Sequence, residues 1–384
     1  MSGLPSSAAV VVVGGGVIGA STAFHLAEAG VRDVVLLERD GLASGSTSRA
    51  AGGVRAQFSD ELNIAIALRS LDAFAAFATR PGGEIDLRQV GYLFLLDRAA
   101  DVAAFERSVA LQNSLGVPSR MIDVAEAERL CPLAGTNGVL AATYCPIDGH
   151  ASPEAVVQGY AVAARAHGAH VETGCALTAI EVDGGEIVAV ETARGRIEVS
   201  TVVCAAGVWS RPVAAFAGVE LPVDPVKRQI WFTGPVSDLP DEIPFTVDFT
   251  SGLYFHRSGP GLLFGMADRN QPPGFDAALD PARLERVSEV AERRVPRLAE
   301  LGIQGGWTGY YEVTPDHNAL IGEAPGVSRF LYATGFSGHG FLQGPAVGEI
   351  MRDLVLERAP FVDVAPLSAE RFAGTAMRPE YNVI

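Results

Sequence analysis

The chain has 384 residues, of which 48% are hydrophobic and 19% are charged, and its formal net charge is −16. This composition excludes an intrinsically disordered protein and predicts a large core divided among two or three domains. The negative charge argues against nucleic acid and anionic membrane surfaces as partners. No apolar run reaches the roughly 20 residues that a membrane-spanning helix needs.

The N-terminus and the cysteines bear on the compartment. Residues 1–9 lack the basic segment that opens a signal peptide, so we expect a cytoplasmic protein. Cys131, Cys145, Cys175 and Cys204 form no CxxC pair and no histidine-rich cluster. Their spacing suggests neither a metal site nor a disulfide framework, and reduced thiols are the expectation.

Residues 10–38 form the most informative segment. An apolar strand at 10–13 leads into a glycine turn and an amphipathic helix that ends at Ala29, and a second apolar strand ends at Glu38. Strand, turn, helix, strand and acid follow one another within a single βαβ unit. This order favours a dinucleotide-binding site over a glycine-rich turn without a ligand.

Each of these residues has a role if a dinucleotide lies across the unit. Gly14 makes the tight turn, Gly16 lets the backbone approach a pyrophosphate, and Gly19 lets the helix pack closely on the strand. The helix N-terminus faces the negative phosphates. Glu38 can accept hydrogen bonds from the adenosine ribose.

Loops, helices and strands alternate after this unit, according to the hydrophobic periodicity and the turn residues. The predicted elements are a small-residue loop at 41–53, a helix at 60–79, a strand pair at 84–97, and helices at 101–115 and 124–130. Asp123 is the expected N-cap of the last helix.

A helix and a small antiparallel meander are predicted in the middle of the chain. Ser152 and Pro153 begin the helix as its N-cap and first helical residue. The turns at 183–185 and 194–195 are hairpin signals, so we expect antiparallel strands within 170–207. Further predicted elements are strands 229–232, 253–257, 262–266 and 330–333, helix 280–300, a glycine-rich turn at 335–344 and a final helix 345–357.

Nucleotide-fold patterns thus recur at the start, the middle and the end of the chain. We therefore predict an α/β protein with a discontinuous Rossmann-like domain made of residues 1–85, 146–222 and 310–384. The intervening residues, 86–145 and 223–309, are expected to form a mostly antiparallel β substrate domain with helices.

Several motifs in a fixed order resemble one known family over nearly the whole chain. They are GGGVIGASTAFHLAEAG with VVLLERD, SGSTSRAAGGVR, DGHASPEAVVQGYA, VVCAAGVWS, and TPDHNALIG followed by GFSGHGFLQGPAVGEI. They resemble the D-amino-acid-oxidase-like flavoprotein oxidoreductases, nearest to the sarcosine oxidase (β-subunit type) and glycine oxidase branch. The resemblance implies FAD as cofactor and oxidation of a C–N bond of an amino acid.

The resemblance also implies a set of cofactor-binding residues. Those for the ADP part are Gly14, Gly16, Val17, Ile18, Gly19, Glu38 and Arg39. Those beside the flavin and its ribityl chain are Ser46, Thr47, Gly52, Gly53 and Val54, with Ala176 near the adenine and Ala206, Gly207 and Trp209 at the second nucleotide strand. The turn facing the pyrimidine edge of the flavin is Gly338, His339, Gly340, Phe341, Leu342 and Gln343, where a helix N-terminus stabilises negative charge on reduced flavin.

Five positions depart from the family pattern. Gly309 and Arg49 stand where relatives with covalent flavin carry a cysteine or a histidine, so we predict dissociable FAD. Leu263 stands where some oxidases carry a lysine that activates oxygen, which leaves oxygen or another electron acceptor open. Tyr311 and Gly338 replace the arginine pair that holds the carboxylate in bacterial glycine oxidases.

Candidate substrate-site residues follow from the same resemblance. Arg55 resembles the carboxylate-binding arginine, since a guanidinium binds a carboxylate with two hydrogen bonds; a surface or phosphate-side arginine is the alternative. Tyr254 and Tyr311 resemble pocket tyrosines, although each could be a core aromatic residue. His256 and His339 are candidates for tuning protonation, with a solvent-facing strand histidine as the alternative for His256.

The leading hypothesis is an FAD enzyme that oxidises the C–N bond of a glycine- or sarcosine-type amino acid, in a biosynthetic pathway or in use of the free amino acid. The imine product would hydrolyse to an amine and an oxo-acid or aldehyde. Two alternatives are a dehydrogenase that passes electrons to a partner subunit and a non-catalytic FAD-binding subunit. An oligomer is compatible with all three. Lys227, the only lysine, either reaches the mouth of the active site or is simply exposed.

Overall fold

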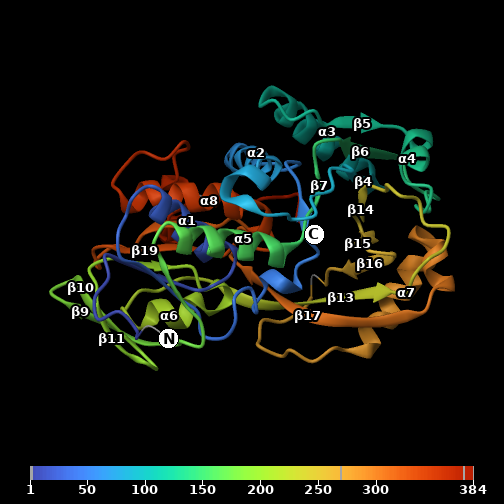
Figure 1. Ribbon diagram of the computed structural model, residues 1–384. Helices are drawn as coiled ribbons and strands as arrows, with labels where there is room; N and C mark the ends of the chain where they lie inside the picture. The colour runs from blue at the N-terminus through green and yellow to red at the C-terminus, as the bar shows by residue number, and fades with distance from the viewer. Residues whose placement is uncertain (1–2, 269, 375–376, 384) are drawn as a thin grey trace.

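Two large β-sheets form the two halves of the molecule, with helices packed around them (Figure 1). The structure is a computed structural model that describes residues 3–268, 270–374 and 377–383. None of the helices in these ranges is both long and apolar enough to cross a membrane.

The first sheet has six strands in the order β18-β19-β12-β1-β2-β8. Its strands are β1 (Val10–Val13), β2 (Val34–Leu37), β8 (His170–Glu172), β12 (Val202–Cys204), β18 (Leu320–Glu323) and β19 (Phe330–Thr334). All neighbouring pairs are parallel except β18 with β19. The sheet therefore joins three separate stretches of the chain, as the sequence predicts, while the proposed domain boundaries themselves stay a prediction.

Both faces of this sheet are covered, which explains its continuous runs of buried valine and leucine. One face packs on α1 (Val17–Glu28), α5 (Pro153–Ala166) and α8 (Gly340–Val355), with α2 (Glu61–Ala75) lying on α8. The other face packs on the antiparallel meander β9 (Leu177–Asp183), β10 (Glu186–Thr192) and β11 (Gly195–Glu198) and on the short α6 (Ser210–Ala215).

The second sheet has eight strands in the order β17-β13-β16-β15-β14-β4-β6-β5 and is antiparallel except where β14 meets β4. Its strands are β4 (Tyr92–Leu96), β5 (Arg120–Ile122), β6 (Ala141–Cys145), β13 (Asp224–Thr233), β14 (Phe245–Asp248), β15 (Leu253–Ser258), β16 (Gly261–Met266) and β17 (Ile303–Val313). Neighbouring residues face opposite ways, so Tyr254 and Phe255 belong to different core clusters.

Three helices accompany the second sheet, α3 (Ala99–Ser114), α4 (Val124–Leu130) and α7 (Pro281–Arg294), and the two-residue strands β3 (Gly53–Val54) and β7 (Gly149–His150) pair nearby. Helix starts predicted from side-chain caps are confirmed. Asp123 accepts the Glu126 N–H, and Ser152 accepts the Ala155 N–H ahead of Pro153. The meander is also confirmed.

Several predicted elements differ from the observed helices and strands in their bounds. Only β4 forms within 84–97, because Asp86 and Gly91 take positive φ and interrupt the extended chain. The helix expected to end at residue 300 stops at Arg294, before Val295 and Pro296, since a residue that precedes proline disfavours helical geometry. Likewise, the helix predicted to run to residue 79 ends at Ala75, and a separate π-helical turn follows at 78–82.

The last helix differs most from its prediction. α8 begins at Gly340, five residues before Pro345, so half of the predicted glycine-rich turn is helical. Phe341 and Leu342 in the added turn are buried in the core next to α1. Their burial stabilises the turn even though Pro345 lacks a backbone donor.

Replacing Gly19 with alanine is expected to destabilise the protein by roughly 1–3 kcal/mol. An extra methyl group in a tightly packed core forces the surrounding atoms into strained positions. A Cβ at Gly19 would lie 1.9 Å from the Gly14 carbonyl oxygen. Urea unfolding measures the change. The matched control is Gly41→Ala, where a Cβ would meet nothing within 4 Å, and equal stabilities for the two variants would contradict the prediction.

Candidate active site

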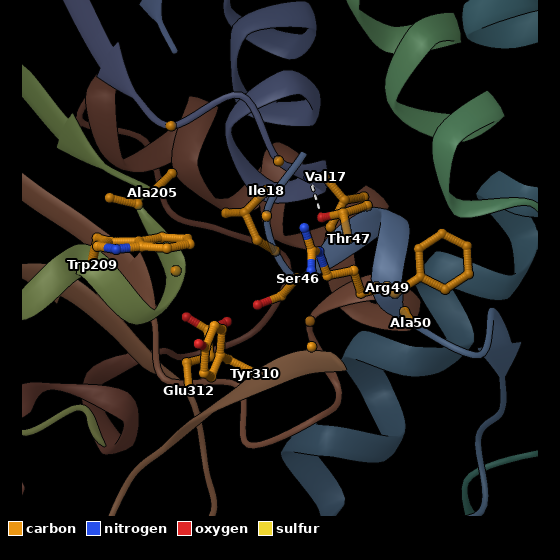
Figure 2. Close-up of a pocket in the computed structure, with 18 of the residues that line it drawn as sticks. Val17, Ile18, Ser46, Thr47, Arg49, Ala50, Ala205, Trp209, Tyr310 and Glu312 are labelled. Carbon is orange, nitrogen blue, oxygen red and sulfur yellow. Dashed lines mark hydrogen bonds between the residues drawn. The ribbon is translucent and has the colours of Figure 1, made fainter. Parts of the chain in front are cut away.

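A cavity of about 880 Å³ runs from the β1–α1 turn to the aromatic face of the second sheet (Figure 2). It is lined by most of the predicted cofactor residues: Gly14, Gly16, Val17, Ile18, Glu38, Arg39, Ser46, Thr47, Gly52, Gly53, Ala176, Ala206, Gly207, Trp209, Gly338, His339, Gly340, Phe341 and Leu342. Among the predicted substrate residues, it is lined by Arg55, Tyr254 and Tyr311.

Backbone geometry explains the glycine turn at one end of the cavity. Gly14 has φ +115°, and a Cβ there would lie 2.3 Å from the Ala205 carbonyl oxygen. Gly15, which was not among the predicted cofactor-binding residues, donates its N–H to Glu38 Oε2 at 2.7 Å. Thr47 Oγ1 accepts the Val17 N–H at 3.2 Å, marked by a dashed line in Figure 2. Glu38 and Thr47 therefore fix the turn and leave the start of α1 open to an anion.

A second helix N-terminus opens on the same cavity. α8 begins at Gly340, directly after Gly338 and His339. Gly338 has φ +99°, and a Cβ there would lie 2.4 Å from the Tyr311 ring, so only glycine fits. The partial positive charge of a helix N-terminus is thus available at both ends of the cavity.

Three predicted cofactor residues lie outside the lining and act through packing. Gly19 lies beneath the turn, against the Gly14 carbonyl. Val54 is fully buried in β3, and Gln343 is buried and donates to Asn63 Oδ1. These three support the cavity without forming its surface.

Tyrosines and one arginine form the other end of the cavity. Burial raises the pKa of Tyr311 and holds the pKa of Tyr254 well above its usual value, so both phenols stay neutral. Tyr92 and Phe245 stack beside them, with ring centroids 4.3 Å apart. Arg55 is 2% exposed, and its guanidinium lies over the Phe58 ring.

Arg55 uses several of its donors within the protein. Nη1 donates to the Gln57 carbonyl, and Nη2 donates to the Asn382 carbonyl at 2.6 Å and contacts His339 Nε2 at 3.2 Å. Because arginine has no acceptor, the His339 nitrogen accepts that bond. Burial holds the pKa of His339 well below its usual value, which agrees with a neutral ring.

Asp148 compensates part of the Arg55 charge from behind the cavity. It is fully buried and accepts hydrogen bonds from the Ala56 N–H and Gln57 Nε2. Burial raises its pKa to about 6, and the nearby Arg55 charge opposes that rise. Asp148 opens the DGHASPEAVVQGYA motif, but nothing in the sequence indicated that it lies beside Arg55, 93 residues earlier in the chain.

Glu312 is a second carboxyl group that sequence reasoning missed, although it stands in an apolar strand just before the TPD motif. It faces the cavity near Tyr310 and Ser46 (Figure 2) and accepts the Thr334 hydroxyl at 2.9 Å. The side chain is partly buried in the wall of the cavity. Burial therefore raises its pKa to about 7.

His256 was predicted to be catalytic, and the structure places it outside the cavity lining. Its two ring nitrogens contact the Arg257 and Ala51 carbonyls at 2.7 and 2.9 Å, and its ring stacks on Phe245. Burial lowers its pKa to about 3, although hydrogen bonds to the two carbonyls oppose that shift. These contacts hold the ring between β15 and the loop at Ala51, and a catalytic role for His256 stays a prediction.

The positions that depart from the family pattern fall into two groups. Gly309 and Arg49 both line the cavity, and a Cβ at Gly309 would lie 2.9 Å from the Arg49 Cβ. Leu263 is 5% exposed within the core cluster of Tyr254 and lies outside the lining. Lys227 is buried, lies outside the lining, and donates to Asp276 at 2.6 Å and to the Ala278 carbonyl.

The four cysteines are buried thiols. Across residues 3–268, 270–374 and 377–383, no group of three or more His, Cys, Asp or Glu side chains could hold a metal ion.

Comparison with known proteins identifies the family. The profile described as FAD dependent oxidoreductase matches residues 9–354. The chain belongs to this family. Among solved structures, L-proline dehydrogenase from P. horikoshii superposes with a TM-score of 0.92 at 33% identity, covering 96% of this chain and 99% of that one. Glycine oxidase from Geobacillus kaustophilus gives a TM-score of 0.85 at 27% identity, covering 94% and 98%.

A curated relative is also similar over most of the sequence. Mitochondrial dimethylglycine dehydrogenase from Mus musculus is 30% identical over 385 residues, which covers 95% of this chain. The chain spans only 44% of that relative's length. The resemblance noted from the motifs, the α/β fold and FAD as cofactor are thereby confirmed.

Glu312→Gln is expected to stabilise the cofactor-free protein increasingly as the pH rises from 5 to 8. Because the native pKa is raised to about 7, the folded protein loses stability as this carboxyl ionises between its unfolded value and pH 7, and glutamine does not ionise. The change in the variant's advantage should be on the order of 1–3 kcal/mol.

Thermal unfolding of both proteins at pH 5 and pH 8 measures this difference. Glu106→Gln, at an exposed position of α3, is the control and should show no such trend. A stability difference for Glu312→Gln that stays constant with pH would contradict the assignment of the raised pKa.

Proposed function

We propose that the protein oxidises the C–N bond of a glycine- or sarcosine-type, N-substituted amino acid with FAD as the hydride acceptor. The observation that carries this proposal is the far end of the cavity, where positively charged arginines and neutral tyrosines adjoin the glycine turn at Gly338. A small amino acid offers a carboxylate to the arginines and a C–H bond beside its amine. Relatives named for dimethylglycine, glycine and L-proline support the same class of substrate.

The residues at the cavity fit FAD in three places. The start of α1, with Gly14 and Gly16, would hold the diphosphate, and Glu38 would hold the adenosine ribose. The start of α8 would face the flavin and stabilise the negative charge that the flavin gains on reduction. Glycine is required at Gly53 and Gly338 in the cavity wall, because a Cβ there would clash with Tyr92 and Tyr311.

Bound FAD supplies the two-electron acceptor for this reaction. The protein's own contribution is positioning, since hydride transfer from an oriented amine needs little acid–base chemistry. Arg55 and Arg228 give the wall its positive charge, and the neutral Tyr254 and Tyr311 phenols can orient the amine. The substrate loses a hydride and a proton to become an imine, which water hydrolyses to an amine and an oxo-acid or aldehyde. A cytoplasmic location belongs to the same proposal, and cell fractionation tests it.

The purified protein should be yellow, and its flavin absorbance should bleach under nitrogen when a suitable amine is added. A panel of sarcosine, dimethylglycine, glycine and proline, monitored by anaerobic spectroscopy, measures this. If every member leaves the flavin oxidised, the proposed substrate class is wrong. Release of FAD on acid precipitation, with a colourless protein pellet, would support the proposal of dissociable cofactor.

A second candidate is a dehydrogenase that passes electrons to an acceptor other than oxygen. Leu263, in place of a lysine, and the engagement of Lys227 by Asp276 favour it. We expect slow flavin reoxidation in air and faster reoxidation by an artificial electron acceptor, measured by stopped-flow absorbance. Stoichiometric hydrogen peroxide at a rate equal to turnover would contradict this candidate. If no amine of the panel reduces the flavin of the isolated chain, the hypothesis of a non-catalytic FAD-binding subunit is favoured.

A further inference from the structure

Arg228 has an unused hydrogen-bonding edge at the cavity. On β13 its side chain lies on the same face as Ile230, which also lines the cavity. Nη1 donates to the Lys227 carbonyl at 3.1 Å, whereas Nε is buried without a partner. Nη2 has no hydrogen-bond partner either among the residues that the structure describes. The edge formed by Nε and Nη2 is therefore free.

That edge is the one with which other arginines of this chain bind carboxylates. Arg371 binds Asp316 through Nε and Nη2, both at 2.9 Å, and Arg196 binds Glu181 through the same two atoms at 3.0 Å. Arg228 has no carboxylate partner among the described residues. A buried cation without such a partner is costly, which indicates a site for an anion supplied from outside.

Arg55, by contrast, has no such edge available. Both bidentate modes of a guanidinium use Nη2, and here Nη2 is already engaged by the Asn382 carbonyl and His339 Nε2. A ligand carboxylate could therefore reach only its remaining single donors. Arg55 thus contributes positive charge and holds the C-terminal residues in place.

The surroundings of Arg228 suit a small carboxylate. Its guanidinium lies 4.7 Å from the centre of the Tyr311 ring, which orients the side chain. Gly309 stands opposite it in the β13–β17 register, and Arg49 packs against Gly309. Arg228 also lines a second cavity of about 940 Å³, which makes it the residue shared by the two linings. Arg228 is thus the described residue that a ligand in either cavity can contact.

We propose that Arg228, and not Arg55, binds the substrate carboxylate through its Nε and Nη2 donors and thereby sets the preference for amino acids over simple amines. This proposal rests on the proposed function and names the residue that determines its specificity. It places the carboxylate beside Tyr311, at the boundary between the two cavities.

Arg228→Gln tests the proposal through ligand preference. In the FAD-loaded protein, we expect the apparent Kd for sarcosine, from anaerobic flavin reduction, to rise roughly 10- to 100-fold, the value of a lost charged pair. The Kd for sarcosine amide should change little, so the carboxylate-over-amide preference collapses. Lys227→Gln is the control: it removes the positive charge of the residue next to Arg228 on β13. This variant should keep the native preference for sarcosine over sarcosine amide.

Arg228→Lys serves as the second variant, and it decides the matter if Arg228→Gln does not retain FAD. A lysine keeps the charge but loses the two-donor edge, so an intermediate loss of sarcosine affinity is expected, with amide affinity unchanged. The proposal is overturned if both variants keep the native preference for sarcosine over sarcosine amide. If only Arg228→Lys holds FAD, the native preference in that variant alone overturns it.

Propionate separates this proposal from the proposed function. Propionate carries a carboxylate but no amine to oxidise, so its binding is read from the shift of the flavin spectrum without turnover. Weakened propionate binding in Arg228→Gln supports the assignment even if no amine reduces the native flavin. A native protein that shows no propionate-dependent shift, or an Arg228→Gln variant that binds propionate as tightly as the native protein, overturns it.

Discussion

The close approach of α1 to the β1 turn and to α8 is the constraint on which the site depends. Gly19 lies against the Gly14 carbonyl, where a Cβ would come within 1.9 Å. On the other side of α1, Gly344 and Gly348 lie one helical turn apart on α8, and a Cβ at either would clash with Val17 or Ser21. Small residues at these contacts bring two helix N-termini to one cavity, which no single element could do alone.

Buried charge imposes the second constraint. Arg294 is nearly fully buried and is paired with Asp97 and Asp248, and Arg371 is paired with the buried Asp316. Pairing of this kind is what burial of an ion requires. Arg55 meets the requirement differently, through carbonyl oxygens and the nearby Asp148 charge. Arg228 stands apart because it lines the cavity while its Nε and Nη2 have no hydrogen-bond partner among the described residues.

Local features of the sequence were enough to predict the nucleotide-binding unit. The glycine spacing, the apolar strands and the acid at Glu38 all lie within 29 consecutive residues, and each has a local physical cause. Helix caps such as Ser152 could be predicted for the same reason. β17 was missed because its glycines and aromatic residues follow no clear alternation, and it is held in place by β13, about 80 residues earlier in the chain.

Side-chain roles that depend on distant partners were beyond sequence reasoning. Arg55 has the position that the resemblance implies, yet its donors are taken by Asn382, which is 327 residues away. His256 is a residue type suited to proton transfer, yet both of its ring nitrogens contact backbone carbonyls, one of them in the loop at Ala51. Glu312 became recognisable only when Thr334, from another strand, met it in the cavity.

The phase of β13 explains why the site contains an arginine and excludes the chain's only lysine. Ile230 belongs to the core cluster at the cavity face of the sheet, and Trp231 belongs to the cluster on the opposite face. Burying both side chains fixes which way every residue of the strand points, because a shift of one residue would exchange the two faces. Arg228 therefore lines the cavity with Ile230, and Lys227 lies on the other face of the strand, where it donates to Asp276. The burial of Ile230 and Trp231 thus determines that Arg228, and not Lys227, lines the cavity.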